Sequence, residues 1–108
     1  MDISSRKHND VTIVAFAGHL DSATAPRAQQ AIDEILARGV RKLVIDFTKV
    51  DYVSSAGLRV LLGTAKRLGS GGLRLFGLNE TVGEVFQISG FATILAVFPT
   101  ESAALERL

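Results

Sequence analysis

The sequence predicts a single α/β domain over residues 1–108, in which helices pack on a mixed, mostly parallel β-sheet. Short runs of β-branched and aromatic residues alternate with segments whose apolar residues recur every three or four positions. A strand, a helix and a second strand usually join in a right-handed crossover with parallel strands. The alternation therefore predicts the order β-β-α-β-α-β-α-β-α. A length of 108 residues suits one compact domain with its own core.

The first three elements follow from residues 3–39. "VTIVAFAG", residues 11–18, is typical of a strand, and a turn after residue 8 pairs it with a short strand over residues 3–8. "LDSATAPRAQQAIDEILARG" predicts a helix, because its alanines and isoleucines fall on one face and a proline fits the first turn. Ser22 or Thr24 is the expected cap of that helix.

The remaining elements are three strands and three helices. "KLVIDF", residues 42–47, has consecutive apolar residues, as in a strand that is covered on both faces. The clearest helix opens at the "SSAG" tetrad, residues 54–57, and its leucines stay in register to Leu68. The other expected elements are a strand over 73–78, a helix from Asn79 in which Thr81 and Glu84 have capping-box spacing, a strand over 94–98 and a helix after Pro99.

The charge distribution argues against nucleic-acid binding. Twelve basic and eleven acidic side chains give a formal charge of +1, and the basic residues are scattered among acids. Binding to a phosphate backbone needs a concentrated basic surface, and base stacking needs aromatic residues. With one Tyr and no Trp, the chain has neither feature.

The residue types predict no cofactor and no metal site. The chain has no Cys, which excludes disulfides and thiolate ligands and fits the reducing cytoplasm, where we expect the protein. Its two histidines, His8 and His19, are isolated, so a histidine metal site is not expected. The opening "MDISSRKHND" is polar, unlike a secretory signal, and no apolar run approaches a membrane span.

Polar residues gather where the predicted strands end. In sheets of this kind, functional groups lie in the loops after the carboxyl ends of the strands. The loops expected here are 18–24, 46–55 and 77–79. They should bring together the side chains of Asp21, Asp46, Asp51, Ser54, Ser55 and Asn79.

Two catalytic interpretations fit these residues poorly. A serine hydrolase of the α/β type presents G-x-S-x-G, but Ser55 lies in "VSSAG", where Val53 replaces the first glycine. A receiver-type phosphoacceptor would use Asp46 at a strand end, but it needs clustered acids to hold Mg²⁺. The first long strand ends "AFAGHLD" without an acidic pair, and no lysine follows "ILAVFPT".

Each of these residues also has a purely structural explanation. Asp46 can satisfy loop amides, Ser54 or Ser55 can cap the helix, and Gly57 can allow close packing of helix on sheet. A cap and a modification site are compatible, because the free amides and the dipole at a helix start favour a phosphate. A phosphoserine adds roughly −1.5 to −2 charges. At Ser55 this charge would disturb a docked partner more than the fold.

The segment "VIDFTKVDYVSSAGLRVLL" resembles the signature of the STAS domain, in particular that of the bacterial anti-sigma factor antagonists. "GHLDSATAP" is similar to the G-x-L-D segment of that family, and "GGLRLFGLNETVGEVFQISGF" to its fourth strand and third helix. The resemblance covers essentially the whole chain, and its D-x-x-x-V-x-Y-x-S-S-A-G-L core is highly specific.

The resemblance implies a non-enzymatic protein that switches partners. Unphosphorylated members bind an anti-sigma factor that is also a serine kinase of the histidine-kinase-like ATPase type, and so release the sigma factor or another regulator. The kinase phosphorylates a loop serine and breaks the complex, and a PP2C-type phosphatase reverses the reaction. No nucleic acid and no membrane insertion are implied.

The family's phosphorylated loop corresponds to Ser54, Ser55, Ala56 and Gly57. Many members read D-S-S-G or D-S-T-G, so Ala56 removes the hydroxyl before the glycine. Ser55 is the expected phosphorylation site, and Ser54 is the second candidate. The family's loop and strand-end aspartates match Asp21 and Asp46, which would contact the partner. Arg59 and Lys66, on the outer face of the following helix, would supply a rim or simply a solvated surface.

The family also contains accessory subunits of membrane transport ATPases, in which no phosphorylation is needed. That alternative binds the nucleotide-binding subunit of a transporter. The pair of serines at 54 and 55 favours partner switching over it.

Overall fold

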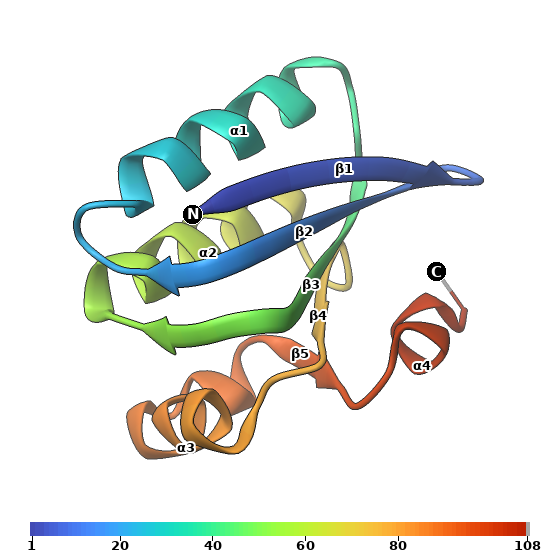
Figure 1. The fold of residues 1–108 in the computed structure, drawn as a ribbon. Helices are drawn as coiled ribbons and strands as arrows, with labels where there is room; N and C mark the ends of the chain where they lie inside the picture. The colour runs from blue at the N-terminus through green and yellow to red at the C-terminus, as the bar shows by residue number, and fades with distance from the viewer. Residues whose placement is uncertain (108) are drawn as a thin grey trace.

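The computed structural model describes residues 1–107, which form one α/β domain around a five-stranded sheet (Figure 1). The strands lie side by side in the order β1-β2-β3-β4-β5, which is also their order along the chain. The elements are β1 (Asp2–His8), β2 (Val11–Leu20), α1 (Ala25–Ala37), β3 (Lys42–Val53), α2 (Ser55–Leu68), β4 (Leu73–Phe76), α3 (Glu80–Ser89), a 3₁₀ turn η1 (Phe91–Thr93), β5 (Ala96–Phe98) and α4 (Glu101–Leu105).

The strand pairing confirms the predicted mixed sheet. β1 and β2 run antiparallel, with Asp2 opposite Ala17 and His8 opposite Val11. The pairs β2–β3, β3–β4 and β4–β5 are all parallel. Since parallel neighbours need a crossover connection, each of these pairs is joined through a helix.

The two faces of the sheet are covered differently. The larger core lies on the face that α1, α2 and α3 cover, and its centre is an edge-to-face stack in which Phe47 contacts Phe16 and Phe86 at centroid distances of 6.2 and 6.3 Å. The opposite face has a small core under α4, formed by Val11, Ile13, Val44, Phe76 and Ala104. In Figure 1, α1 is drawn above β1 and α2 behind β2, whereas α4 lies at the right, away from the other three helices.

The strand predicted over residues 42–47 is longer than expected. β3 continues to Val53, and its last residues pair with the end of β2, His19 opposite Tyr52 and Leu20 opposite Val53. Two register shifts between β2 and β3 accompany this pairing, beside Ala15–Ala17 and Gly18–His19, and at each of them β3 contains one extra residue, as in a β-bulge. The expectation that Asp46 ends this strand is therefore wrong, because Val50 and Val53 are buried and extend the strand beyond it.

The starts of two helices follow the prediction only in part. α3 begins after Asn79 as predicted, and the Oδ1 of Asn79 accepts the N–H of Val82 at 2.7 Å, so the cap does not use the Thr81–Glu84 pair. Thr24 is the residue before α1, but its hydroxyl donates to the carbonyl of His19 instead of capping the helix.

The last elements are shorter than predicted. Gly90 adopts a left-handed conformation with φ of 79°, which ends α3 and starts the 3₁₀ turn η1. Because η1 takes up the following residues, β5 begins at Ala96 and not at Ile94. α4 ends at Leu105, and the expected final residue of that helix, Leu108, lies outside the described residues.

Candidate functional site

The carboxyl ends of β2 and β3 meet the start of α2. The backbone N–H of Ser54 donates to the carbonyl of Leu20 at 2.9 Å, which joins the end of β2 to the residue before the helix. Gly57 permits this approach, since a Cβ atom on it would lie 2.7 Å from the Leu20 carbonyl oxygen. The glycine of the "SSAG" tetrad therefore has a packing reason in this chain.

The two serines of the tetrad have different surroundings. Ser54 is the N-cap of α2, and its hydroxyl oxygen accepts the N–H of Gly57 at 3.4 Å. Ser55 is the first helical residue and its side chain is exposed. Within residues 1–107 the Ser55 hydroxyl makes no hydrogen bond, so it is the more accessible of the two.

Asp21 organises the turn between β2 and α1. Its Oδ1 accepts the backbone N–H groups of Ala23 and Thr24 at 2.9 and 3.1 Å. The bond from Thr24, helped by that from Ala23, lowers the pKa of Asp21 below its ordinary value, although burial opposes the shift. Asp21 therefore carries a negative charge next to the strand end that contacts Ser54.

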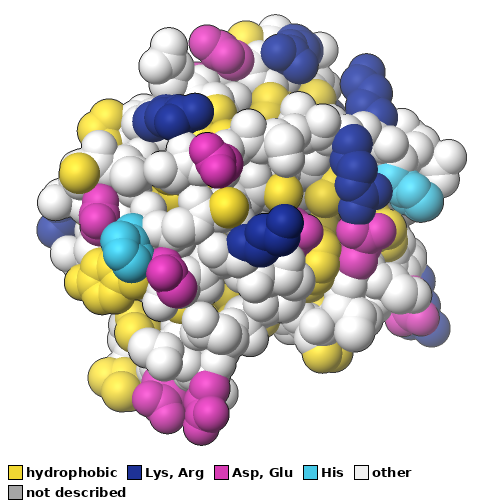
Figure 2. Space-filling model, in the orientation of Figure 1, with side chains coloured by type: hydrophobic (Ala, Val, Ile, Leu, Met, Phe, Trp, Pro, Cys, Tyr) yellow, Lys and Arg dark blue, Asp and Glu magenta, His cyan; other side chains and the backbone are white. Residues whose placement is uncertain are grey.

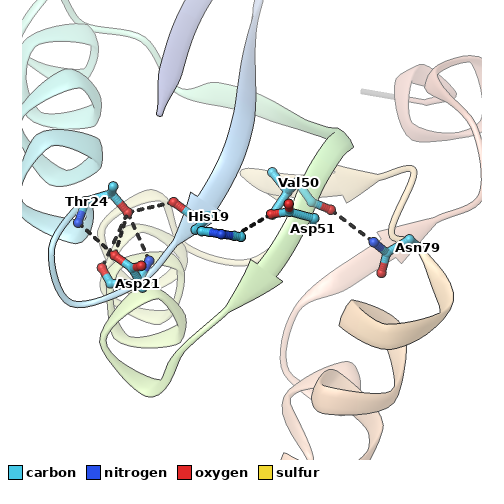
Figure 3. A network of polar contacts seen from close by, with 6 residues as sticks. All are labelled: His19, Asp21, Thr24, Val50, Asp51 and Asn79. Atoms are coloured by element: carbon cyan, nitrogen blue, oxygen red, sulfur yellow. Dashed lines mark hydrogen bonds and ion pairs between the residues drawn. The ribbon is translucent and has the colours of Figure 1, made fainter.

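A second polar group bridges the ends of β2 and β3. The Nδ1 of His19 lies 2.7 Å from Oδ1 of Asp51, and both side chains are exposed. The ring of Tyr52, which is 47% exposed, packs edge-to-face on His19 with centroids 6.0 Å apart. Figure 3 shows His19 pointing from its strand toward Asp51, with Asp21 and Thr24 in the adjoining turn.

Asn79 ties α3 to the same end of the sheet. Its Nδ2 donates to the carbonyl of Val50 at 3.3 Å while its Oδ1 caps the helix (Figure 3). The structure thus brings five of the six predicted side chains to one end of the sheet: Asp21, Asp51, Ser54, Ser55 and Asn79.

Asp46 does not join this group. It precedes Val53 by seven strand residues, a distance of about 23 Å at ~3.3 Å per residue. Its Oδ1 accepts the N–H and the hydroxyl of Thr48 at 2.8 and 2.7 Å, as the structural explanation predicts. Asp46 and Thr48 line a hollow of about 250 Å³ with β1 residues, away from the "SSAG" tetrad.

The two cationic residues predicted on α2, Arg59 and Lys66, lie at different distances from the start of the helix. Arg59 is exposed and follows Ser55 by one helical turn, so the two share a face. Lys66 is in the last turn, about 16 Å from Ser55 at 1.5 Å per residue. Ala56 is half-buried against the core and Gly57 is buried, which limits what a partner can touch there.

The sequence showed His19 as isolated and did not predict its contacts with Asp51 and Tyr52. Those contacts depend on the continuation of β3 to Val53, which places Tyr52 opposite His19. A signal for this extension is present, because "TKVDYV" is rich in the β-branched and aromatic residues that favour strands.

The face of the molecule drawn in Figure 2 carries side chains of both charges. On the face drawn in Figure 2, basic, acidic and histidine side chains are interspersed. Among residues 1–107, no helix combines the length and hydropathy needed to cross a membrane. In the same part of the chain, no three His, Cys, Asp or Glu side chains converge as metal ligands would.

Comparison with known proteins identifies the family. The profile of the STAS domain matches residues 2–104. BtrV of Bordetella bronchiseptica is 38% identical over 106 residues, which is 96% of this chain and 91% of BtrV. The anti-sigma-B factor antagonist of Listeria monocytogenes is 32% identical over 90% of this chain and 86% of its own.

A protein of the same named class also has a similar solved structure. The crystal structure of an anti-sigma factor antagonist from Mycobacterium paratuberculosis has a TM-score of 0.89 and 28% identity to this chain. The similarity covers 96% of this chain and 90% of that one. With its five-stranded mixed sheet and the tetrad at the start of α2, the chain belongs to the STAS domain family.

Proposed function

We propose that this protein is an anti-sigma factor antagonist that switches partners through phosphorylation of Ser55. The unphosphorylated form binds an anti-sigma factor that is also a serine kinase, and thereby releases a sigma factor or another regulator. Phosphorylation abolishes the binding, and a PP2C-type phosphatase restores it. The antagonist class is supported by the names of the Listeria and Mycobacterium relatives.

The observation that carries this proposal is the difference between Ser54 and Ser55. The amide and hydroxyl of Ser54 are both used, one on Leu20 and the other on Gly57. Ser55 is exposed at the first position of α2, where a kinase can reach its hydroxyl. Modification of Ser55 needs no native hydrogen bond to break, whereas modification of Ser54 alters the hydroxyl that accepts the N–H of Gly57.

A phosphate on Ser55 changes the charge of a surface that already contains acids. Asp21 and Asp51 lie at the same end of the sheet, and the phosphate adds roughly −1.5 to −2 charges there. A partner surface that fits a neutral hydroxyl offers no cation of its own to the dianion, so docking must remove the water around the phosphate without replacing it. Burying an unpaired charge costs several kcal/mol, on the order of the binding energy of a weak complex.

The fold itself tolerates the same phosphate. The group would sit at the N-terminus of α2, where free amides and the helix dipole favour negative charge. Arg59, four residues later on the same helical face, supplies a cation at a spacing that stabilises acid–base pairs. The two effects explain how binding can be lost while folding is retained.

The proposed partner surface is the exposed end of the sheet around Ser55. It comprises Asp21, Ser54, Ser55, Arg59 and the half-buried Ala56, and the buried Gly57 holds the start of α2 close to Leu20 beneath it. Asp46 is left out because it lies about 23 Å from the strand end. Lys66 belongs to this surface only if the partner extends along the whole of α2.

We propose a binding role and not a catalytic one. Nucleophilic catalysis by a serine requires a base within hydrogen-bond reach of the hydroxyl. Within residues 1–107, the Nδ1 of His19 is bonded to Asp51, and neither serine hydroxyl is hydrogen-bonded to a histidine. The serines are therefore better suited to receive a phosphoryl group than to act on a substrate.

Phosphosite mapping after incubation with the cognate kinase and ATP tests the site. Wild type, Ser54→Asn and Ser55→Ala are compared, since asparagine keeps an N-cap acceptor without a hydroxyl. We expect wild type and Ser54→Asn to be labelled on Ser55, and Ser55→Ala to remain unlabelled. Labelling of Ser55→Ala at the wild-type level would show that the site assignment is wrong.

The alternative role as a transporter subunit predicts a different partner. A pull-down from the native host distinguishes the two: recovery of a kinase with a histidine-kinase-like ATPase domain supports partner switching. Recovery of a transporter nucleotide-binding subunit, with no phosphorylation of Ser55, would replace the proposal. Neighbouring kinase and phosphatase genes, or transporter genes, provide the same discrimination at little cost.

A further inference from the structure

Tyr52 differs from the other exposed apolar side chains of this protein in its position. Residues 1–107 expose four large hydrophobic side chains: Tyr52, Ile88, Ile94 and Val97. Isolated apolar residues on a surface are ordinary and need no functional explanation. Tyr52, however, lies on β3, which runs directly into Ser54 and the start of α2. Its exposed ring is therefore close to the proposed partner surface.

A short series of contacts holds the Tyr52 ring in place. The ring packs edge-to-face on His19, with the centroids 6.0 Å apart and the ring planes at 89°. His19 is itself fixed, because its Nδ1 lies 2.7 Å from Oδ1 of Asp51 and its carbonyl accepts the hydroxyl of Thr24 at 2.8 Å (Figure 3). A side chain that is already ordered loses less conformational freedom when a partner docks on it. The ring is thus prepared for a contact with another protein.

Tyr52 lies within the area that a kinase acting on Ser55 would cover. Phosphoryl transfer requires the Ser55 hydroxyl to be held inside the active site of the kinase. A standard interface removes about 800 Å² of surface from each partner, so a round patch centred on Ser55 would reach roughly 15 Å from it. Tyr52 precedes Ser55 by three residues, so their Cα atoms are at most about 11 Å apart at ~3.6 Å per residue.

We propose that Tyr52 is the aromatic anchor through which the surface around Ser55 binds its kinase, and that His19 positions the Tyr52 ring. This inference rests on the proposed function and adds to it the residue that contributes most to the binding. Tyrosine is enriched at such positions because its ring buries a large apolar area and has few rotatable bonds to immobilise.

The neighbouring charge defines the partner surface that fits this anchor. Asp51 and Tyr52 both contact His19, so the carboxylate lies beside the ring. Within residues 1–107, the Asp51 carboxylate bonds His19 through Oδ1, which leaves Oδ2 for a donor on the partner. The complementary surface of the kinase is an apolar recess that receives the Tyr52 ring, with a basic side chain at its edge that pairs with Asp51.

Titration calorimetry with the unphosphorylated protein and the kinase that labels Ser55 tests the anchor. We expect Tyr52→Ala to weaken binding at least about thirtyfold, as loss of an interface hot spot does, and Tyr52→Phe to stay within about threefold of wild type. Ile88→Ala, which truncates a side chain that is 87% exposed on α3, is the matched control and should bind like wild type. If Tyr52→Ala unfolds in a thermal melt, Tyr52→Leu, which keeps an apolar side chain without the ring, should show at least about tenfold weaker binding.

A double-mutant cycle tests the positioning role of His19. His19→Ala should weaken binding by about three- to tenfold in the wild-type background, but by less than about twofold when Tyr52 is already alanine. A general effect of His19 on the fold would weaken binding equally in both backgrounds. Equal losses would therefore show that His19 does not act through Tyr52.

The possible outcomes separate this inference from the proposed function. A kinase that labels Ser55 and binds Tyr52→Ala as tightly as wild type would overturn the anchor and leave the phosphorylation switch intact. Weakening that the Ile88→Ala control shares would also overturn the anchor. If no kinase binds the wild-type protein, the proposed function fails, and the anchor fails with it.

Discussion

Hydrogen bonds near the start of α2 determine which polar groups remain available to a partner. Ser54 uses its amide on Leu20 and its hydroxyl on Gly57, while Asp21 uses one carboxylate oxygen on two turn amides. Asp51 is bonded to His19. Among the described residues of this group, Ser55 alone has an unused hydroxyl. The hydrogen bonds of the neighbouring residues therefore leave the Ser55 hydroxyl as the group most available to a partner or a kinase.

The Asp21 turn predicts a pH dependence of stability. The pKa of Asp21 is lowered in the folded chain, chiefly by the Thr24 N–H. Its charge therefore stabilises the fold above the unfolded pKa of about 3.9, and this contribution is lost as the pH falls through the lower folded value. Asp21→Asn keeps an acceptor oxygen but removes the charge, so it should lower the free energy of unfolding near neutrality.

Urea unfolding of wild type and Asp21→Asn at about pH 6 and about pH 3 measures this effect. We expect the difference in free energy of unfolding between the two proteins to shrink at the lower pH. Since Asp10 and Asp33 also have lowered pKa values, through Lys42 and Arg67, only the difference between proteins isolates Asp21. A difference that does not change with pH would contradict the prediction.

Within α2, two glycines have opposite packing environments. A Cβ on Gly57 would lie 2.7 Å from the backbone oxygen of Leu20, whereas a Cβ on Gly63 would meet nothing within 4 Å. Alanine is better than glycine in a helix by about 1 kcal/mol, but overpacking costs about 1–3 kcal/mol. We expect Gly57→Ala to lower the free energy of unfolding by about 1–2 kcal/mol and Gly63→Ala to raise it by up to about 1 kcal/mol. Chemical denaturation of both variants measures the two shifts, and a change of the same sign in both would refute the packing explanation.

The order of the elements was predictable because hydrophobic periodicity and helix signals are local. The alternation of strands and helices predicted the parallel crossovers. The same pattern correctly predicted that polar side chains lie together near the strand ends, namely Asp21, Ser55 and Asn79. The length of β3 was not predictable in the same way, since it depends on pairing with β2 through register shifts. Because the strand was expected to end at residue 47, Asp46 was expected at its end, and the contact between His19 and Tyr52 was not predicted.

At the scale of the whole molecule, the proposed switch separates binding from folding. The tetrad lies at one end of the sheet, while the core is centred on Phe47 and its neighbours Phe16 and Phe86. Truncating such a core phenylalanine costs about 3–5 kcal/mol, a large part of the stability of a domain this size. A substitution at exposed Ser55 typically changes stability by only about ±0.5 kcal/mol. The position suits a signal that must be reversible.

This separation predicts the behaviour of Ser55→Asp, which introduces a negative charge at the phosphorylation site. The charge sits at the start of α2, near Arg59, so the thermal midpoint should stay within about 4 °C of wild type. Binding to the kinase should weaken at least about tenfold, because the partner must desolvate the carboxylate.

Ser55→Asn is the matched neutral control of equal size and should bind much more tightly than Ser55→Asp. Titration calorimetry for binding and a thermal melt for folding give the two readouts. If Ser55→Asp unfolds, or if Asn and Asp weaken binding equally, the loss reflects capping or shape and not charge.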